Sequence, residues 1–80
     1  MKYFVFSRND CPYCDDAIKL LKDKNLNFDS VVFYEEHKSI LSEIKKCYEW
    51  PTVPIVLSIT DKETSLIGGY TDLVEHLKNE

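Results

Sequence analysis

Hydrophobic and polar positions alternate in blocks along the 80-residue chain, and the period of each block predicts a strand or a helix. Apolar and β-branched runs bounded by turn residues predict strands over residues 3–6, 28–34, 55–60 and 64–67. Apolar residues spaced three and four apart predict helices over residues 12–24, from 35 or 36 to 48, and from about 71 to 78. The predicted order is therefore β-α-β-α-β-β-α.

The same pattern predicts where the helices end and which side chains they bury. Asn25 can adopt the left-handed conformation that ends the first helix, and Thr71 is a good N-cap for the last. The predicted buried stripe of the middle helix is Ile40, Leu41, Ile44, Cys47 and Tyr48. We accordingly expect Cys47 to be a buried free thiol, because unpaired cysteine is commonly buried.

The order of elements predicts an α/β fold. Its opening strand, helix and strand predict a right-handed parallel unit, and the later hairpin adds two antiparallel strands to the same sheet. We expect a four-stranded mixed sheet flanked by three helices, with helices on both faces. Residues 1–80 contain no internal repeat and no low-complexity linker, so we expect one domain.

Composition narrows the function classes. A formal net charge of −4 argues against nucleic acid or an anionic membrane as the main partner. The apolar run near the N-terminus, residues 3–6, is too short for a signal peptide or a membrane span. Three cysteines are too few, and odd in number, for a secreted disulfide scaffold. We therefore expect a cytoplasmic protein, in a compartment where a Cys-x-x-Cys pair is more often catalytic or metal-binding than structural.

The segment Cys11-Pro12-Tyr13-Cys14 lies where the first strand pattern gives way to the first helix pattern. With Cys11 at the N-cap, Pro12 falls at the first helical position, which tolerates its missing N–H. Residues three apart on a helix have Cβ atoms about 5–6 Å apart, and a disulfide needs Cα atoms about 4.4–6.8 Å apart. The pair can therefore open and close, with Cys11 as the more accessible nucleophile and Cys14 as the resolving thiol.

Charges around Cys11 act in both directions on its thiolate. The free N–H groups of the first helical turn favour an anion at this position, and Arg8 adds a positive charge three residues upstream. Asp10, Asp15 and Asp16 oppose a negative sulfur. We expect the thiolate of Cys11 to be stabilised on balance.

A zinc site is the main alternative use of the two thiols. Structural zinc needs four ligands, and the other candidates are Cys47, His37 and His76. Because Cys47 falls on the predicted apolar stripe, we expect no metal site.

Besides the dithiol motif Cys11-Pro12-Tyr13-Cys14, the chain contains Thr52-Val53-Pro54 and the segment from Gly68 to Asp72, in this order and with the expected elements between them. With these three motifs the whole chain resembles the glutaredoxins. The second motif resembles the family's TVP segment with a cis proline, and the third resembles its GGYTD segment. The resemblance implies a thioredoxin-like fold and glutathione-dependent thiol–disulfide exchange.

The resemblance also implies a glutathione site. In it, the backbone of Val53 pairs with the cysteine of glutathione, Asp72 and the N–H groups near it hold the γ-glutamyl end, and Arg8 attracts the glycine carboxylate. A further basic contact from the middle helix is assigned to Lys45. The expected glutathione-binding residues are Arg8, Tyr13, Thr52, Val53, Pro54, Gly69, Tyr70, Thr71 and Asp72.

On the same basis we expect a monomer with no bound cofactor, which uses glutathione as a reducing co-substrate. Its implied clients are disulfide-containing and glutathionylated proteins, ribonucleotide reductase among them. Two alternatives stay open: a small thioredoxin-like donor reduced by thioredoxin reductase, and a carrier that holds an iron–sulfur cluster through Cys11 and glutathione. The departures from the usual family pattern are Asp10 before the dithiol and the Trp50-Pro51 pair before the TVP segment.

Overall fold

The computed structural model describes residues 1–78 and contains the elements that periodicity predicts, in the predicted order. The strands are β1 (Lys2–Arg8), β2 (Phe28–Phe33), β3 (Ile55–Ile59) and β4 (Thr64–Gly68). The helices are α1 (Pro12–Asp23), α2 (Lys38–Tyr48), preceded by the 3-10 turn η1 (Glu35–His37), and α3 (Tyr70–Lys78). None of these helices is both long and apolar enough to cross a lipid bilayer.

The four strands form one mixed sheet in the order β2-β1-β3-β4, which confirms the predicted fold class. β1 runs parallel to β2 and antiparallel to β3, and β3 runs antiparallel to β4. β1 is therefore central, as its continuous apolar run predicts. The chain leaves its carboxyl end directly into the dithiol segment, at the edge of a parallel unit where ligands commonly bind.

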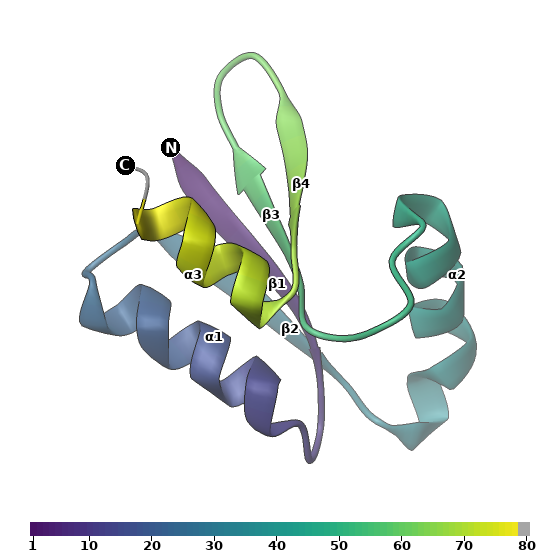
Figure 1. Cartoon of the computed structure of the whole chain (residues 1–80). Coiled ribbons are helices and arrows are strands. Elements are labelled where there is room, and N and C mark those ends of the chain that lie inside the picture. Colours follow the sequence, from purple (N-terminus) through teal and green to yellow (C-terminus); the bar gives the residue numbers. More distant parts are fainter. Residues whose placement is uncertain (79–80) are drawn as a thin grey trace.

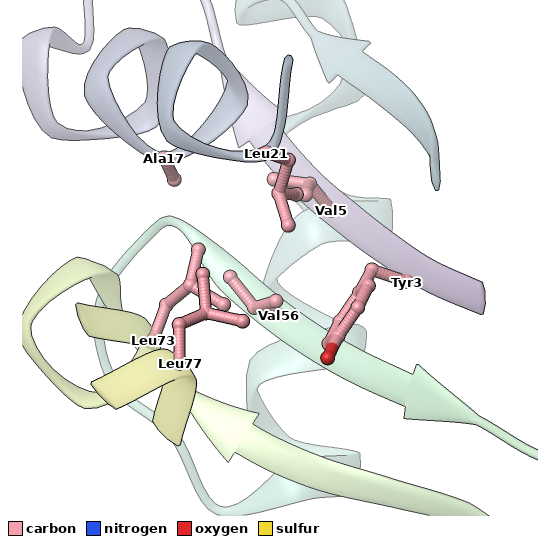
Figure 2. Packing of buried hydrophobic residues seen from close by; sticks show 7 residues of the cluster. All are labelled: Tyr3, Val5, Ala17, Leu21, Val56, Leu73 and Leu77. Carbon is pink, nitrogen blue, oxygen red and sulfur yellow. The ribbon is translucent and has the colours of Figure 1, made fainter. Parts of the chain in front are cut away.

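Helices α1 and α3 lie side by side on one face of the sheet and α2 lies on the other (Figure 1). Alternate residues of β1 point to the α1/α3 face, and they meet apolar side chains from both helices (Figure 2). The buried cluster there consists of Tyr3, Val5, Ala17, Leu21, Val56, Leu73 and Leu77. This packing fixes α1, and with it the dithiol at the start of α1, against the sheet.

The α2 face is built from aromatic rings. The ring of Phe6 lies 5.0 Å from that of Phe4, 6.4 Å from that of Phe33 and 6.3 Å from that of Tyr48 on α2, measured between centroids. Phe4, Phe6 and Tyr48 remain half-buried. α2 thus covers this face less completely than α1 and α3 cover theirs.

Three expectations about the helices need correction. Cys47 is exposed, not buried, and Ile40 on the same helix is 55% exposed, because α2 buries Leu41 and meets β1 through the ring of Tyr48, which lies near that of Phe6. The middle helix begins with a 3-10 turn, so Glu35 is not in an α-helical turn. α3 starts at Tyr70, one residue before Thr71, so Thr71 lies inside the helix and does not cap it.

Candidate active site

The dithiol is held by the first turn of α1, as the position of the proline predicts. Cys11 is the N-cap, with extended φ and ψ of −125° and 96°, and Pro12 is the first helical residue. The Cα atoms of Cys11 and Cys14 are 5.2 Å apart and the two sulfurs form a disulfide. The structure therefore places the pair within disulfide reach without any departure from the helix.

The two sulfurs differ in access and in hydrogen bonding. Cys14 is 1% exposed and Cys11 is 7% exposed, so Cys11 is the one that a substrate can approach. The backbone N–H of Cys14 donates a hydrogen bond to Sγ of Cys11 at 3.3 Å. An N–H aimed at this sulfur from a helix N-terminus stabilises a thiolate there once the disulfide is reduced.

The short loop between β1 and α1 is fixed on both sides. The N–H of Asn9 donates to the backbone oxygen of Phe33 at 3.0 Å, which continues the pairing of β1 with β2 beyond Arg8. Asp10 then adopts a left-handed conformation with φ of 53°, which aspartate tolerates better than most residues. The chain thereby turns sharply into Cys11 and leaves Arg8 exposed beside it.

Two surface hollows meet beside the dithiol, and together they contain every predicted glutathione-binding residue. The hollow that includes the nucleophile has a volume of about 370 Å³ and is lined by Arg8, Asp10, Cys11, Pro12, Tyr13, Lys45, Pro51, Thr52 and Val53. The second has a volume of about 340 Å³ and is lined by Tyr13, Trp50, Thr52, Val53, Pro54, Gly69, Tyr70, Thr71 and Asp72. Because they share Tyr13, Thr52 and Val53, they form one groove, which we call the dithiol groove.

The walls of the dithiol groove come from distant parts of the sequence. The peptide bond between Val53 and Pro54 is cis, as the resemblance implies. The rings of Tyr13 and Tyr70 lie 6.1 Å apart between centroids, inclined by 32°. Lys45, the basic residue assigned from the middle helix, lines the groove on the side of Arg8.

The segment that leads into α3 is shaped by Asp72. Its carboxylate accepts a hydrogen bond from the N–H of Gly69 at 3.0 Å. Asp72 therefore performs the capping that propensity assigns to Thr71. Gly68 has φ of +124°, and a Cβ added there would lie 2.7 Å from Oδ2 of Asp72. Glycine is therefore required at residue 68 for both conformation and space.

Trp50 is a groove residue that the sequence alone did not assign. It lines the second hollow, and its ring lies 3.8 Å from the position that a Cβ on Gly69 would take. Its Nε1 is buried and has no hydrogen-bond acceptor among the described residues. The position of this aromatic side chain just before the TVP-like segment indicates that Trp50 lies near the groove, but the sequence pattern alone does not distinguish a groove wall from a core position.

The histidines and the third cysteine lie elsewhere. His76 contacts the ring of Tyr3, and Nδ1 of His37 accepts a hydrogen bond from the N–H of Tyr34 at 3.2 Å. Within residues 1–78, no three His, Cys, Asp or Glu side chains are grouped closely enough to hold a metal ion.

Comparison with protein-family models decides the family. The glutaredoxin model matches residues 3–62, which is most of the chain and includes the dithiol and the TVP-like segment. The chain belongs to the glutaredoxin family. Glutaredoxins are thiol–disulfide oxidoreductases, and the Cys11–Cys14 pair is placed as the Cys-x-x-Cys centre of such an enzyme.

Solved glutaredoxins share the fold. Wheat glutaredoxin is 26% identical with a TM-score of 0.76, over 95% of this chain and 71% of that one. Reduced Escherichia coli glutaredoxin is 27% identical with a TM-score of 0.60, over 100% and 96%. Glutaredoxin 1 from Francisella tularensis is 23% identical with a TM-score of 0.70, over 99% and 98%. No curated protein sequence matches the chain significantly.

Proposed function

We propose that this glutaredoxin reduces protein disulfides and protein–glutathione mixed disulfides at the expense of glutathione. The observation that carries the proposal is the convergence of the nine expected glutathione-binding residues on the dithiol groove. A groove beside an N-capping cysteine suits a tripeptide whose central thiol must reach that sulfur.

The polar groups of the groove match the two ends of glutathione. Arg8 and Lys45 stand at one end, where they attract the glycine carboxylate. Asp72 and the first turn of α3 stand at the other, where the carboxylate of Asp72 pairs with the γ-glutamyl ammonium and backbone N–H groups hold the γ-glutamyl carboxylate. The backbone of Val53 lies between them for pairing with the cysteine of glutathione.

Reduction of a client proceeds in two exchanges. The Cys11 thiolate attacks one sulfur of the client disulfide, a Cys11–client bond forms, and the other client sulfur leaves as a thiolate that takes a proton from water. The Cys14 thiol, as its thiolate, then attacks Sγ of Cys11 and releases the second client thiol. The client gains two electrons and the enzyme is left with the Cys11–Cys14 disulfide.

Glutathione restores the dithiol by the reverse chemistry. One glutathione thiolate attacks the enzyme disulfide, and a second attacks the resulting mixed disulfide and leaves as oxidised glutathione. With a glutathionylated client, Cys11 attacks the glutathione sulfur, the client thiol leaves, and a second glutathione completes the cycle without Cys14.

We further propose that the protein acts as a monomer in the reducing cytosol and holds no resident cofactor. Ribonucleotide reductase, a dithiol client of the family, is the protein substrate that we would test first.

The test is a comparison of electron donors. Turnover of a glutathione mixed disulfide should consume NADPH when glutathione and glutathione reductase are supplied, and not when thioredoxin reductase replaces them. Cys11→Ser should abolish turnover, whereas Cys14→Ser should keep measurable deglutathionylation and lose reduction of protein disulfides. Efficient turnover with thioredoxin reductase, or equal loss in both variants on the glutathionylated substrate, would contradict the proposal.

A further inference from the structure

A third hollow adjoins the dithiol groove and extends beyond the residues that are expected to bind glutathione. It has a volume of about 250 Å³ and lies between the carboxyl ends of β1 and β2 and one side of α2. It is lined by Arg8, Asn9, Tyr34, Glu35, Lys38, Leu41, Ser42 and Lys45. We call it the basic hollow. Four of these residues belong to α2: Leu41, Ser42 and Lys45 follow Lys38 by three, four and seven positions, so the four form one stripe of the helix.

The charge of the basic hollow is opposite to that of the chain. Arg8, Lys38 and Lys45 face a single carboxylate, that of Glu35, in a protein whose formal net charge is −4. Among residues 1–78, none of these three cations forms a salt bridge, although Lys46 on the same helix pairs with Glu43 at 3.8 Å. Three unpaired cations around one concavity favour an anionic occupant.

Lys38 is the first residue of α2 and directly follows the 3-10 turn η1, which contains Glu35 and Glu36. Among residues 1–78 its ammonium group forms no salt bridge with either carboxylate, and the first α-helical turn contains no acidic residue. Lys38 is therefore available to an anionic group that enters the basic hollow.

The basic hollow and the dithiol groove are continuous. Arg8 and Lys45 line both, and the groove portion that they line also contains Cys11. A polypeptide whose cysteine is joined to Cys11 advances about 3.3 Å per extended residue. A side chain a few residues from that cysteine can therefore enter the basic hollow.

We propose that the basic hollow binds an acidic side chain of the protein client, close in sequence to the cysteine under attack. Arg8 and Lys45 form the shared boundary, and Lys38 is the residue specific to the client. This inference rests on the proposed function and adds to it a class of preferred client: disulfide proteins with glutamate or aspartate near the reactive cysteine.

The test uses three synthetic peptides, each with one intramolecular disulfide, that differ only in having Glu, Gln or Lys beside the cysteines. Fully reduced enzyme is mixed with each peptide, and the second-order rate of peptide reduction is measured in a single turnover. At low salt the Glu peptide should react about tenfold faster than the Lys peptide, with the Gln peptide between them, and 0.5 M salt should remove most of the difference.

Lys38→Glu should abolish or reverse this order. Its matched control is Lys19→Glu, which makes the same change in net charge on the exposed side of α1 and should leave the order intact. Both variants should turn over bis(2-hydroxyethyl) disulfide with glutathione as the wild type does, because neither Lys38 nor Lys19 lines the dithiol groove.

Each failure has a separate meaning. If the wild type does not turn over bis(2-hydroxyethyl) disulfide with glutathione, the proposed function is wrong. If it does, but the three peptides react equally, or Lys19→Glu changes the order as much as Lys38→Glu, the inference about the client is wrong. A several-fold rise in KM for glutathione in Lys38→Glu would assign the basic hollow to the tripeptide and would also overturn the inference.

Discussion

The two faces of the sheet differ in how completely their side chains are buried. On the α1/α3 face, aliphatic side chains interlock, and Val5, Leu21 and Leu73 are fully buried (Figure 2). On the α2 face, half-buried aromatic rings meet a helix whose Ile40 and Cys47 are exposed. The first face contains the helix that begins with the dithiol, and the second contains the helix that lines the basic hollow.

This difference separates two requirements of the enzyme. Chemistry at Cys11 needs a fixed N–H and a fixed partner sulfur, and the densely packed face supplies both through α1. The proposed binding of an acidic client side chain needs exposed positive charge, and α2 contributes Lys38 and Lys45 to the basic hollow. Substitutions on each face can test this contrast.

The largest effect should come from the core of the α1/α3 face. Leu73→Ala removes a fully buried side chain and should lower the free energy of unfolding by about 3 kcal/mol. Ile40→Ala on α2, where the side chain is 55% exposed, should change it by less than about 0.5 kcal/mol. Urea unfolding of both variants measures the difference. Equal losses would show that the two faces contribute alike and would remove the contrast.

The junction between β4 and α3 should give the next effect. Gly68→Ala places a Cβ 2.7 Å from Oδ2 of Asp72 at a residue with φ of +124°. The substitution should lower the free energy of unfolding by about 2 kcal/mol. It should also weaken glutathione binding, because Asp72 must move. Thermal unfolding and KM for glutathione measure the two consequences.

Gly69→Ala is the matched control for the junction. The nearest atoms to its new Cβ are 3.7–3.8 Å away, an ordinary contact distance, so its stability should fall by less than about 1 kcal/mol. Equal losses in the free energy of unfolding for the two variants would show that residue 68 does not require glycine.

The sequence predicts the packed face better than the open one, and the reason is physical. A helical stripe shows which residues can be buried together, but it does not show how much of the stripe the neighbouring sheet and helices cover. For α1, the residues at helical spacing are Cys14, Ala17, Ile18 and Leu21; all are buried except Ile18, which is partly buried against the cluster shared with β1 and α3. For α2, the stripe is wider than its contact with the sheet, so Cys47 is left outside it.

The candidate site divides in the same way. The dithiol, its N-cap and its proline follow from local pattern, since all of them lie within one turn of α1. The convergence of Arg8, Thr52 and Asp72 does not, because no periodicity links residues so far apart, and only the family resemblance brought them together. Propensity alone assigns the capping of α3 to Thr71, whereas in the structure the carboxylate of Asp72 accepts a hydrogen bond from the N–H of Gly69.

The smallest effect should come from Cys47, and it is the sharpest test of the open face. In the oxidised protein Cys11 and Cys14 are joined, so Cys47 is the remaining thiol, and its exposed side chain should be alkylated fully without denaturant. Cys47→Ser should abolish that labelling and change the free energy of unfolding by less than about 0.5 kcal/mol, since water already solvates the site. A thiol that labels only after unfolding, or a loss above 1 kcal/mol, would place Cys47 in a second core and would mean that α2 packs as closely as α1.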